Sequence, residues 1–373
     1  EERAPDGGYY VPTGLPVYAS DELEALFKEQ PAEIVARILN GFFKSKLGRY
    51  DVEFAVGKRL FGLAHISHRI LIGELWRCGD GGFDDLCRRL TNRITAELGS
   101  CEPGAWMRIA CRVALTFAIF AKLREKGAIS HTELIDVAVL TGDFEGPYAL
   151  WVAKRMGLPI GTVICCCNEN GGFWELLNRG QMKLGAKVHK TVTPDCDKAV
   201  PAGLELLIRD KLEWDDVEEF LAVQAKGGTY YLSAEEHRHF REGFAAAVIS
   251  DKRIRMAIPN LYNTNGYILC PYSALVYTGL MDYRSHPGPR RGRWFGRQPV
   301  HRPGAKVFVQ AAAEGYVDQL HAAADAEHRN SAVGRAADHC QLGGVSFRAD
   351  VIQRRLTVVA AVPAGIDVTA AED

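Results

Sequence analysis

Two apolar strands joined by a short helix constrain the fold more than any other feature of this 373-residue chain. Ile135–Leu140 and Gly161–Cys167 are typical of buried strands, and Gly146–Arg155 is typical of a helix between them. A strand, a crossover helix and a second strand form a right-handed βαβ unit when the two strands are parallel. The sequence therefore predicts an α/β fold with a mostly parallel sheet flanked by helices.

Helices are predicted on both sides of this unit along the chain. The clearest is 106–126, which is apolar nearly all round at its centre and is therefore expected to be buried on most sides. Further helices are predicted at 31–44, 84–97, 233–250 and 271–283. The segment 199–285 is expected to be mostly helical, a further helix is predicted at 311–324, and two further strands are predicted within 343–363.

Charge and cysteine usage exclude several function classes. Lys plus Arg is 45 and Asp plus Glu is 46, so there is no electrostatic reason to expect nucleic acid or an acidic membrane as the main partner. The longest strongly apolar run, Val113–Lys122, is half a membrane span, and the first residues show no apolar signal region, so a cytoplasmic protein is expected. The ten cysteines contain no CxxC pair, and Cys165–Cys167 are predicted to be reduced core residues.

Several sequence blocks resemble threonine synthase, an enzyme of the fold-type-II pyridoxal-phosphate class. They are Asp6-GGYYVP, Glu74-LWRCGDGGFDDL, Trp106-MRI, Val139-LTGDFEG through Asn168-EN, and Asn263-TNGYILCPYSALVY. The resemblance implies the large domain of that family, preceded by an N-terminal helical segment. On this basis we expect an N-terminal segment at 1–80, the α/β domain at 81–330, and divergent C-terminal strands at 331–373.

The chain departs from the family where the resemblance would place the cofactor. The lysine that forms the Schiff base in the family is replaced by Asp84, and a carboxylate cannot form an imine with an aldehyde. The phosphate loop reads Gly142, Asp143, Phe144, Glu145, Gly146, which puts two carboxylates where a phosphate dianion would bind. Such repulsion would cost several kcal/mol, an order-of-magnitude figure from partly screened charges. No cofactor is expected, or pyridoxal phosphate only if it is held without a covalent link.

The stretch between Phe83 and Trp106 is also too short for the small domain that the family carries there. The small domain is therefore expected to be absent. In the family this domain closes over the substrate, so its loss would leave the cleft open to water.

The candidate functional residues fall into three groups. The first group could act as acids, bases or metal ligands, or could merely cap the helices that follow: Asp84, Asp85, Asp143 and Glu145. Asn168 and Asn170 are expected to orient a ligand. A Pro/Gly/Arg-rich loop could bind an anion or could be solvated surface, and its candidates are Arg290, Arg291 and Arg293. His65 and His68 lack a third partner for zinc, so no metal is assigned.

We expect a threonine-synthase-like protein that has lost lysine-dependent chemistry. The leading interpretation is a repurposed, cofactor-independent enzyme of lyase or transferase type, acting on an amino-acid-like small molecule in specialised biosynthesis. One alternative is a non-catalytic pseudoenzyme, with a homodimer or a heteropartner covering the surface that small-domain loss exposes. A third interpretation is a residual cofactor-dependent lyase, against which the two loop carboxylates count.

Overall fold

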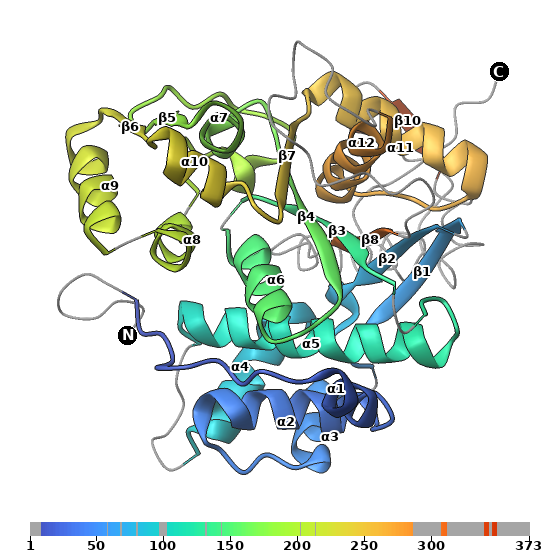
Figure 1. Ribbon diagram of the computed structural model, residues 1–373. Helices are drawn as coiled ribbons and strands as arrows, with labels where there is room; N and C mark the ends of the chain where they lie inside the picture. Colours follow the sequence, from blue (N-terminus) through green and yellow to red (C-terminus); the bar gives the residue numbers. More distant parts are fainter. Residues whose placement is uncertain are drawn as a thin grey trace.

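A six-stranded sheet organises the protein in the computed structural model (Figure 1). The structure describes residues 9–285 except 58, 68, 80, 97–102, 131–132, 143, 202 and 213, together with the strand residues 307–311, 339–342 and 345–348. The strand order is β1 (Gly62–Ser67), β2 (Ile70–Glu74), β8 (Val307–Ala311), β3 (Ile135–Leu140), β4 (Ile160–Cys167) and β7 (Phe244–Val248). Every neighbouring pair is parallel except β1 with β2, so the prediction of a mostly parallel sheet is confirmed.

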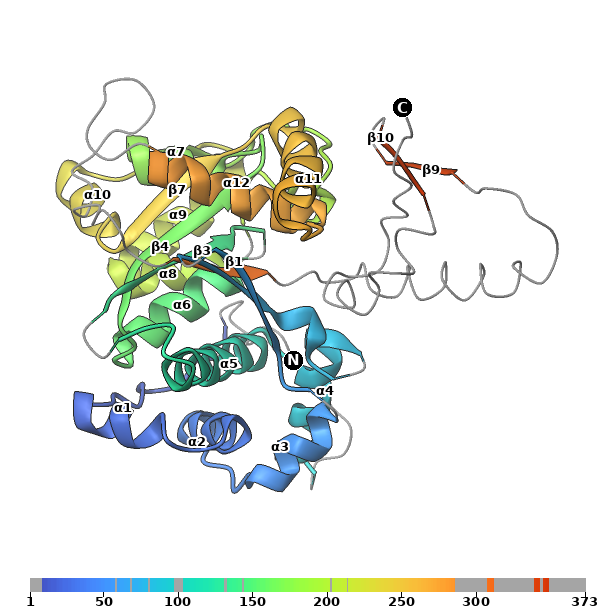
Figure 2. The same ribbon diagram turned by 90° about the vertical axis from the view of Figure 1, so that its right-hand side faces the viewer.

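Helices cover both faces of the sheet, as Figure 2 shows with the sheet between its two helical layers. One layer contains α5 (Ala105–Glu125) and α6 (Glu145–Arg155), and the other contains α11 (Asp251–Asn265) and α12 (Pro271–Ser285). The buried side chains accordingly form two large apolar clusters, one on each side of the sheet. The predicted βαβ unit is present as β3, α6 and β4.

The N-terminal helices form a second layer outside α5. They are α1 (Ser20–Leu26), α2 (Pro31–Phe43), α3 (Arg49–Val56) and α4 (Gly82–Ile94). Helix α5 is buried along nearly its whole length, because α2 packs on one side of it and α6 on the other. The expected burial of this helix on most sides is confirmed.

No domain is inserted between α4 and α5. Helix α4 ends at Ile94 and α5 begins at Ala105, so the chain connects them through residues 95–104 alone. A connection of this length cannot form a folded domain, which needs on the order of 50 residues. The loss of the family's small domain stays a prediction.

A group of short elements lies beyond the β7 edge of the sheet, at the upper left of Figure 1. It comprises α7 (Gly172–Arg179), β5 (Gln181–Lys183), the 3₁₀ turn η2 (Pro194–Cys196), α8 (Leu204–Lys211), α9 (Trp214–Lys226), β6 (Thr229–Tyr231) and α10 (Ala234–Phe240). Strands β5 and β6 form a two-stranded antiparallel sheet. Another 3₁₀ turn, η1 (Leu75–Arg77), follows β2.

The predicted helix at 233–250 is wrong in its second half. The Ser233 cap is present, because its hydroxyl accepts a hydrogen bond from the Glu236 amide, but the helix ends at Phe240. Gly243 then takes a φ of +82°, and Phe244–Val248 pairs with β4 as the edge strand β7. The weakly patterned segment 46–72 also contains α3 and the β1–β2 hairpin, which were not predicted.

The remaining predictions concern the C-terminal third and the surface. Strands β9 (His339–Leu342) and β10 (Val345–Arg348) form an antiparallel pair, whereas the predicted helix at 311–324 lies outside the described residues beyond Ala311.

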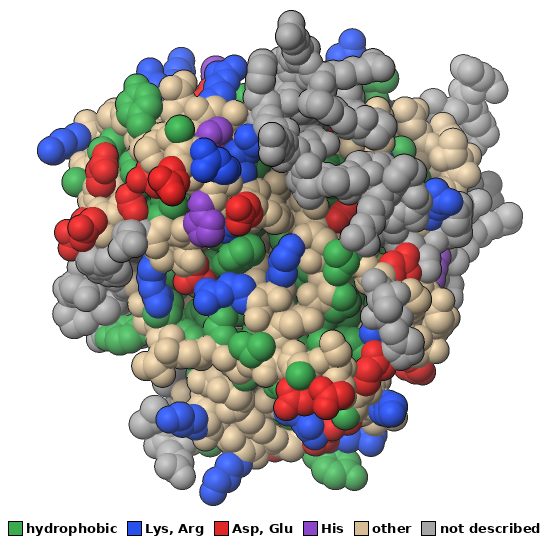
Figure 3. Space-filling model, in the orientation of Figure 1, with side chains coloured by type: hydrophobic (Ala, Val, Ile, Leu, Met, Phe, Trp, Pro, Cys, Tyr) green, Lys and Arg blue, Asp and Glu red, His purple; other side chains and the backbone are tan. Residues whose placement is uncertain are grey.

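Acidic and basic side chains are interspersed on the face shown in Figure 3. Among the described residues, none of the helices has the length and apolarity to cross a membrane. The domain boundaries at 80 and 330 stay predictions.

Candidate functional site

Some of the functional candidates lie in loops at the carboxyl ends of three neighbouring parallel strands. Thr141–Phe144 follows β3, Asn168–Gly171 follows β4, and Ile249 with Ser250 follows β7. Ligands of open α/β sheets bind at this edge, where loops from adjacent strands meet. The loop after β3 is the one that resembles the cofactor-phosphate loop.

Glu145 lies at the start of α6, where its carboxylate is buried and ion-paired. Its Oε1 accepts a hydrogen bond from Arg108 Nε at 2.8 Å and lies 2.6 Å from Arg108 Nη2. Arg112, which is 4% exposed, places its Nε 3.8 Å from the other carboxylate oxygen. Both arginines project from α5. The negative charge of Glu145 is therefore compensated by a helix that precedes it in the chain, with Arg108 37 residues before Glu145.

Asp84 and Asp85 belong to the first turn of α4 and do not join Glu145. Asp84 is exposed, and Asp85 pairs with Arg88 and with Arg89, whose Nε lies 2.6 Å from its carboxylate. The nearest link to the loop is Phe83, whose ring lies 4.3 Å from the Arg112 guanidinium carbon. Asp143 lies outside the described residues.

Chain segments from elsewhere pack against the described part of this loop. A Cβ added at Gly142 would lie 3.3 Å from Cys196 Sγ, so η2 lies directly against the loop. The neighbouring Asp195 accepts a hydrogen bond from the Tyr272 hydroxyl at 2.6 Å. Phe144, at a φ of +58°, is fully buried and its ring lies 4.7 Å from that of Phe173.

Asn168 and Asn170, in the loop after β4, form hydrogen bonds with the segment 189–197, which includes the turn η2 that lies against Gly142. The Asn168 side-chain amide donates to Asp197 Oδ1 at 2.8 Å and to Thr191 Oγ1 at 3.0 Å, and its oxygen accepts from the Asn170 amide at 3.0 Å. The Asn170 side chain donates to the His189 carbonyl at 2.8 Å and accepts from the His189 amide at 2.7 Å. Asn168 is buried, whereas Asn170 reaches the surface of a pocket.

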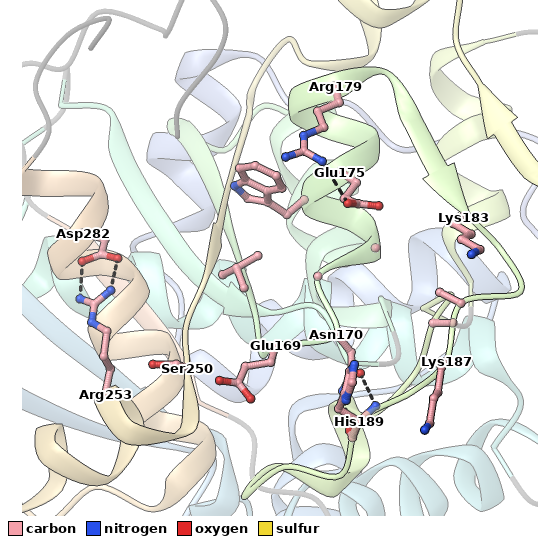
Figure 4. Close-up of a pocket in the computed structure, with 16 residues that line it drawn as sticks. Glu169, Asn170, Glu175, Arg179, Lys183, Lys187, His189, Ser250, Arg253 and Asp282 are labelled. Atoms are coloured by element: carbon pink, nitrogen blue, oxygen red, sulfur yellow. Dashed lines mark hydrogen bonds and ion pairs between the residues drawn. The ribbon is translucent and has the colours of Figure 1, made fainter. Parts of the chain in front are cut away.

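That pocket, drawn in Figure 4, is an open cavity of about 890 Å³ beside the loop after β4. Its wall combines residues of the β4 loop, α7, β5 and the following turn, and the α11–α12 pair. The charged and polar lining residues include Glu169, Asn170, Arg179, Lys183, Lys187 and Arg253. Sequence analysis identified only Asn170, because the others come from four separate elements and share no motif.

No lysine lies on α4, where the resemblance would place the Schiff base, although Lys183 and Lys187 line the pocket at this edge of the sheet. The most buried lysine, Lys211, donates to the His239 and Glu242 carbonyls at 2.9 and 2.6 Å, and burial lowers its pKa to about 8. It lies 5.6 Å from the ring centroid of Phe244, the first residue of β7. Lys211 is therefore at the amino end of the strands, opposite the loop that resembles the cofactor site.

The cysteines and the other candidates add no reactive centre. Cys165–Cys167 are buried thiols in β4, and burial raises the pKa of Cys167 to about 11. Within the described residues no cluster of His, Cys, Asp and Glu could hold a metal ion. His65 lies on β1, while His68, Arg290, Arg291 and Arg293 are outside the part of the chain that the structure describes.

Known proteins similar to this chain share its fold class. The fold resembles that of a pyridoxal-phosphate-bound threonine synthase from Brucella melitensis, with a TM-score of 0.69 at 16% identity over 99% of this chain and 92% of that one. Yeast threonine synthase gives a TM-score of 0.67 at 14% identity, covering 100% of this chain and 92% of that one. The chain thus has the fold of the fold-type-II pyridoxal-phosphate enzymes.

The sequence similarity leads to the same group. Human threonine synthase-like 1 is 26% identical over 266 residues, which cover 64% of this chain and 35% of the human protein. Threonine synthase from Corynebacterium glutamicum is 24% identical over 210 residues, covering 52% of this chain and 43% of that protein. No family model matches the chain. The resemblance to threonine synthase is confirmed, and the aligned part of the chain spans about a third of the human protein.

Proposed function

We propose that this protein is a threonine-synthase homologue that does not use pyridoxal phosphate and that binds an amino-acid-like small molecule. The observation that carries this proposal is the charged side chain that lies at the helix N-terminus after β3. Its helix N-terminus holds the protein's own carboxylate, Glu145, with Arg108 and Arg112 as partners. A helix N-terminus favours one anion, and here that anion is a side chain.

The residues of the loop do not fit the phosphate of the cofactor. Cys196 packs against Gly142, and Glu145 adds a negative charge beside any phosphate that entered. Asp84 cannot supply the amine that the family lysine supplies, and Lys211 is at the opposite edge of the sheet. Covalent attachment and phosphate binding are therefore both disfavoured, and by independent features.

Binding is favoured over acid–base catalysis because the described carboxylates do not form a reactive pair. An acid–base pair needs two titratable groups within reach of one substrate atom. Here Glu145 is buried in an ion pair, Asp85 is paired with arginines of its own helix, and Asp84 is exposed. The repurposed enzyme of the leading sequence interpretation stays a prediction that depends on Asp143.

A direct test is binding of pyridoxal phosphate to the purified full chain, followed by borohydride reduction and mass mapping. We expect no stoichiometric adduct at a single lysine. Asp84→Lys is the informative variant, because it restores an amine at the position that the resemblance assigns to the Schiff base. If the loop is closed to phosphate, this variant also forms no stoichiometric adduct. A single mapped adduct on the wild-type chain, on Lys211 or any other lysine, would overturn the proposal.

The surface near the missing domain stays a separate prediction. Arg93, in the last turn of α4, lies over the ring of Phe54, and Phe54 and Tyr50 on α3 are 72% and 81% exposed. Phe54 therefore lies beside the last turn of α4. Light scattering at several protein concentrations measures whether the predicted homodimer forms, and a monomer at every concentration would contradict it.

A further inference from the structure

We propose that the pocket beside the β4 loop binds an extended zwitterion of the short-peptide type, with its anionic end at Lys183 and Lys187 and its cationic end at Glu169. The inference rests on the small-molecule part of the proposed function and not on the loss of pyridoxal phosphate. Three observations carry it: charges of both signs that have no ion-pair partner among the described residues, their separation across the pocket, and the size of the cavity.

The anionic end is defined by two lysines on one wall. Lys183 ends β5 and Lys187 follows it in the next turn, and both line the pocket and are exposed. Neither forms an ion pair with any residue in the described parts of the chain. Two lysines without a carboxylate partner on the same wall attract an anionic group such as a terminal carboxylate.

The cationic end is defined by Glu169 on the other side. Glu169 follows Asn168 in the loop after β4, and it too has no ion-pair partner among the described residues. The other acidic groups of the pocket are occupied, because Asp282 pairs with Arg253 at 2.5 Å and Glu175 pairs with Arg179 at 3.3 Å. Glu169 is therefore the carboxylate that remains for a ligand ammonium group.

The two ends are separated, and the wall between them is fixed. Figure 4 places Asn170 and His189 between Glu169 and the two lysines. The Asn170 amide is held by two hydrogen bonds to the His189 backbone, so this part of the wall is organised before a ligand arrives. An α-amino acid carries its ammonium and carboxylate groups on the same carbon atom and cannot place them on opposite sides of such a wall.

Size and apolar lining also favour a ligand longer than one amino acid. The cavity of about 890 Å³ is near the upper end of the range for small-molecule pockets, about 300–1,000 Å³. Trp174 and Val248 supply apolar lining, and Arg179 lies over the Trp174 ring with its guanidinium carbon 5.2 Å from the centroid. A short peptide with an apolar central side chain matches both the charged ends and this lining.

The test uses the tripeptide Ala-Phe-Ala with free termini, titrated calorimetrically into the full chain. Matched probes are the same peptide with an acetylated N-terminus, the same peptide with an amidated C-terminus, and free phenylalanine. Variants are Glu169→Gln and the double change of Lys183 and Lys187 to Gln. Lys190→Gln is the control, because Lys190 is exposed on the same segment and does not line the pocket.

We expect the free tripeptide to bind and each terminal block to weaken it by about two- to fivefold, as the loss of an exposed charge pair would. The effect of acetylation should vanish in Glu169→Gln, and that of amidation should vanish in the double lysine variant, while Lys190→Gln behaves as wild type. Absence of tripeptide binding, equal binding of free phenylalanine, or penalties that persist in the matching variants would each overturn the inference. A pyridoxal-phosphate adduct with peptide binding intact would refute the loss of cofactor alone.

Discussion

Replacing Glu145 with Gln should destabilise the folded protein by about 3–4 kcal/mol. The side chain keeps its shape, so the change removes the charge without opening a cavity. Removing one partner of a buried ion pair costs roughly 3–5 kcal/mol, because the remaining charge stays buried without compensation. Arg112 is 4% exposed and cannot rehydrate, whereas the Arg108 side chain is 24% exposed and can do so in part, which favours the lower half of that range.

The assay is urea unfolding followed by circular dichroism and extrapolated linearly to water. Glu53→Gln is a matched control, because Glu53 pairs with Arg49 at 2.6 Å on the exposed surface of α3, with both side chains at least 40% exposed. Exposed pairs of this kind contribute about 0.3–0.5 kcal/mol. Equal loss of unfolding free energy in the two variants would refute the conclusion that Glu145 is a buried, charged replacement for an external anion.

Two further predictions concern the loop network and the thiols. Asn168→Ala should cost about 2–3 kcal/mol of unfolding free energy, because it leaves buried partners unsatisfied, whereas Asn178→Ala, which loses one bond within α7, should cost less than about 1 kcal/mol. Stability should fall above pH 9, because burial raises the pKa of thiols such as Cys165, Cys166 and Cys167, so the unfolded state loses protons first. Urea unfolding at pH 7.5, 9 and 10 measures this, and a constant unfolding free energy across that range would contradict it.

The sheet core could be predicted because its sequence signal is local. Ile135–Leu140 and Gly161–Cys167 are continuous apolar runs of strand length, and α5 is apolar over more turns than a surface helix requires. The edge strand β7 is also a continuous apolar run, but its composition is ambiguous. Its alanine-rich sequence favours a helix by intrinsic propensity, and pairing with β4 overrides that preference.

The candidate site was less predictable, because charge compensation is not local. The sequence shows Glu145 within a loop and gives no indication that Arg108 and Arg112 reach it from α5. It also shows Asn168 and Asn170 as polar residues after a strand, which is equally typical of ligand contacts and of loop scaffolding. In the structure, both side-chain amides form hydrogen bonds with the segment 189–197. Their predicted role as ligand contacts therefore depends on the exposed part of Asn170.

The two changes at the cofactor position support each other physically. In a protein that binds a phosphate at this helix N-terminus, a glutamate at position 145 would repel the phosphate. In such a protein without bound phosphate, the buried arginines would be uncompensated charges. With Glu145 present, one negative charge partly compensates Arg108 and Arg112 in the absence of any ligand. The loop can then stay folded without a cofactor, which removes the stabilisation that ligand binding would otherwise contribute. If the protein does not bind the cofactor, as proposed, Asp84→Lys restores the amine but not the anion site, and we expect recovery of binding to need changes in both α4 and α6.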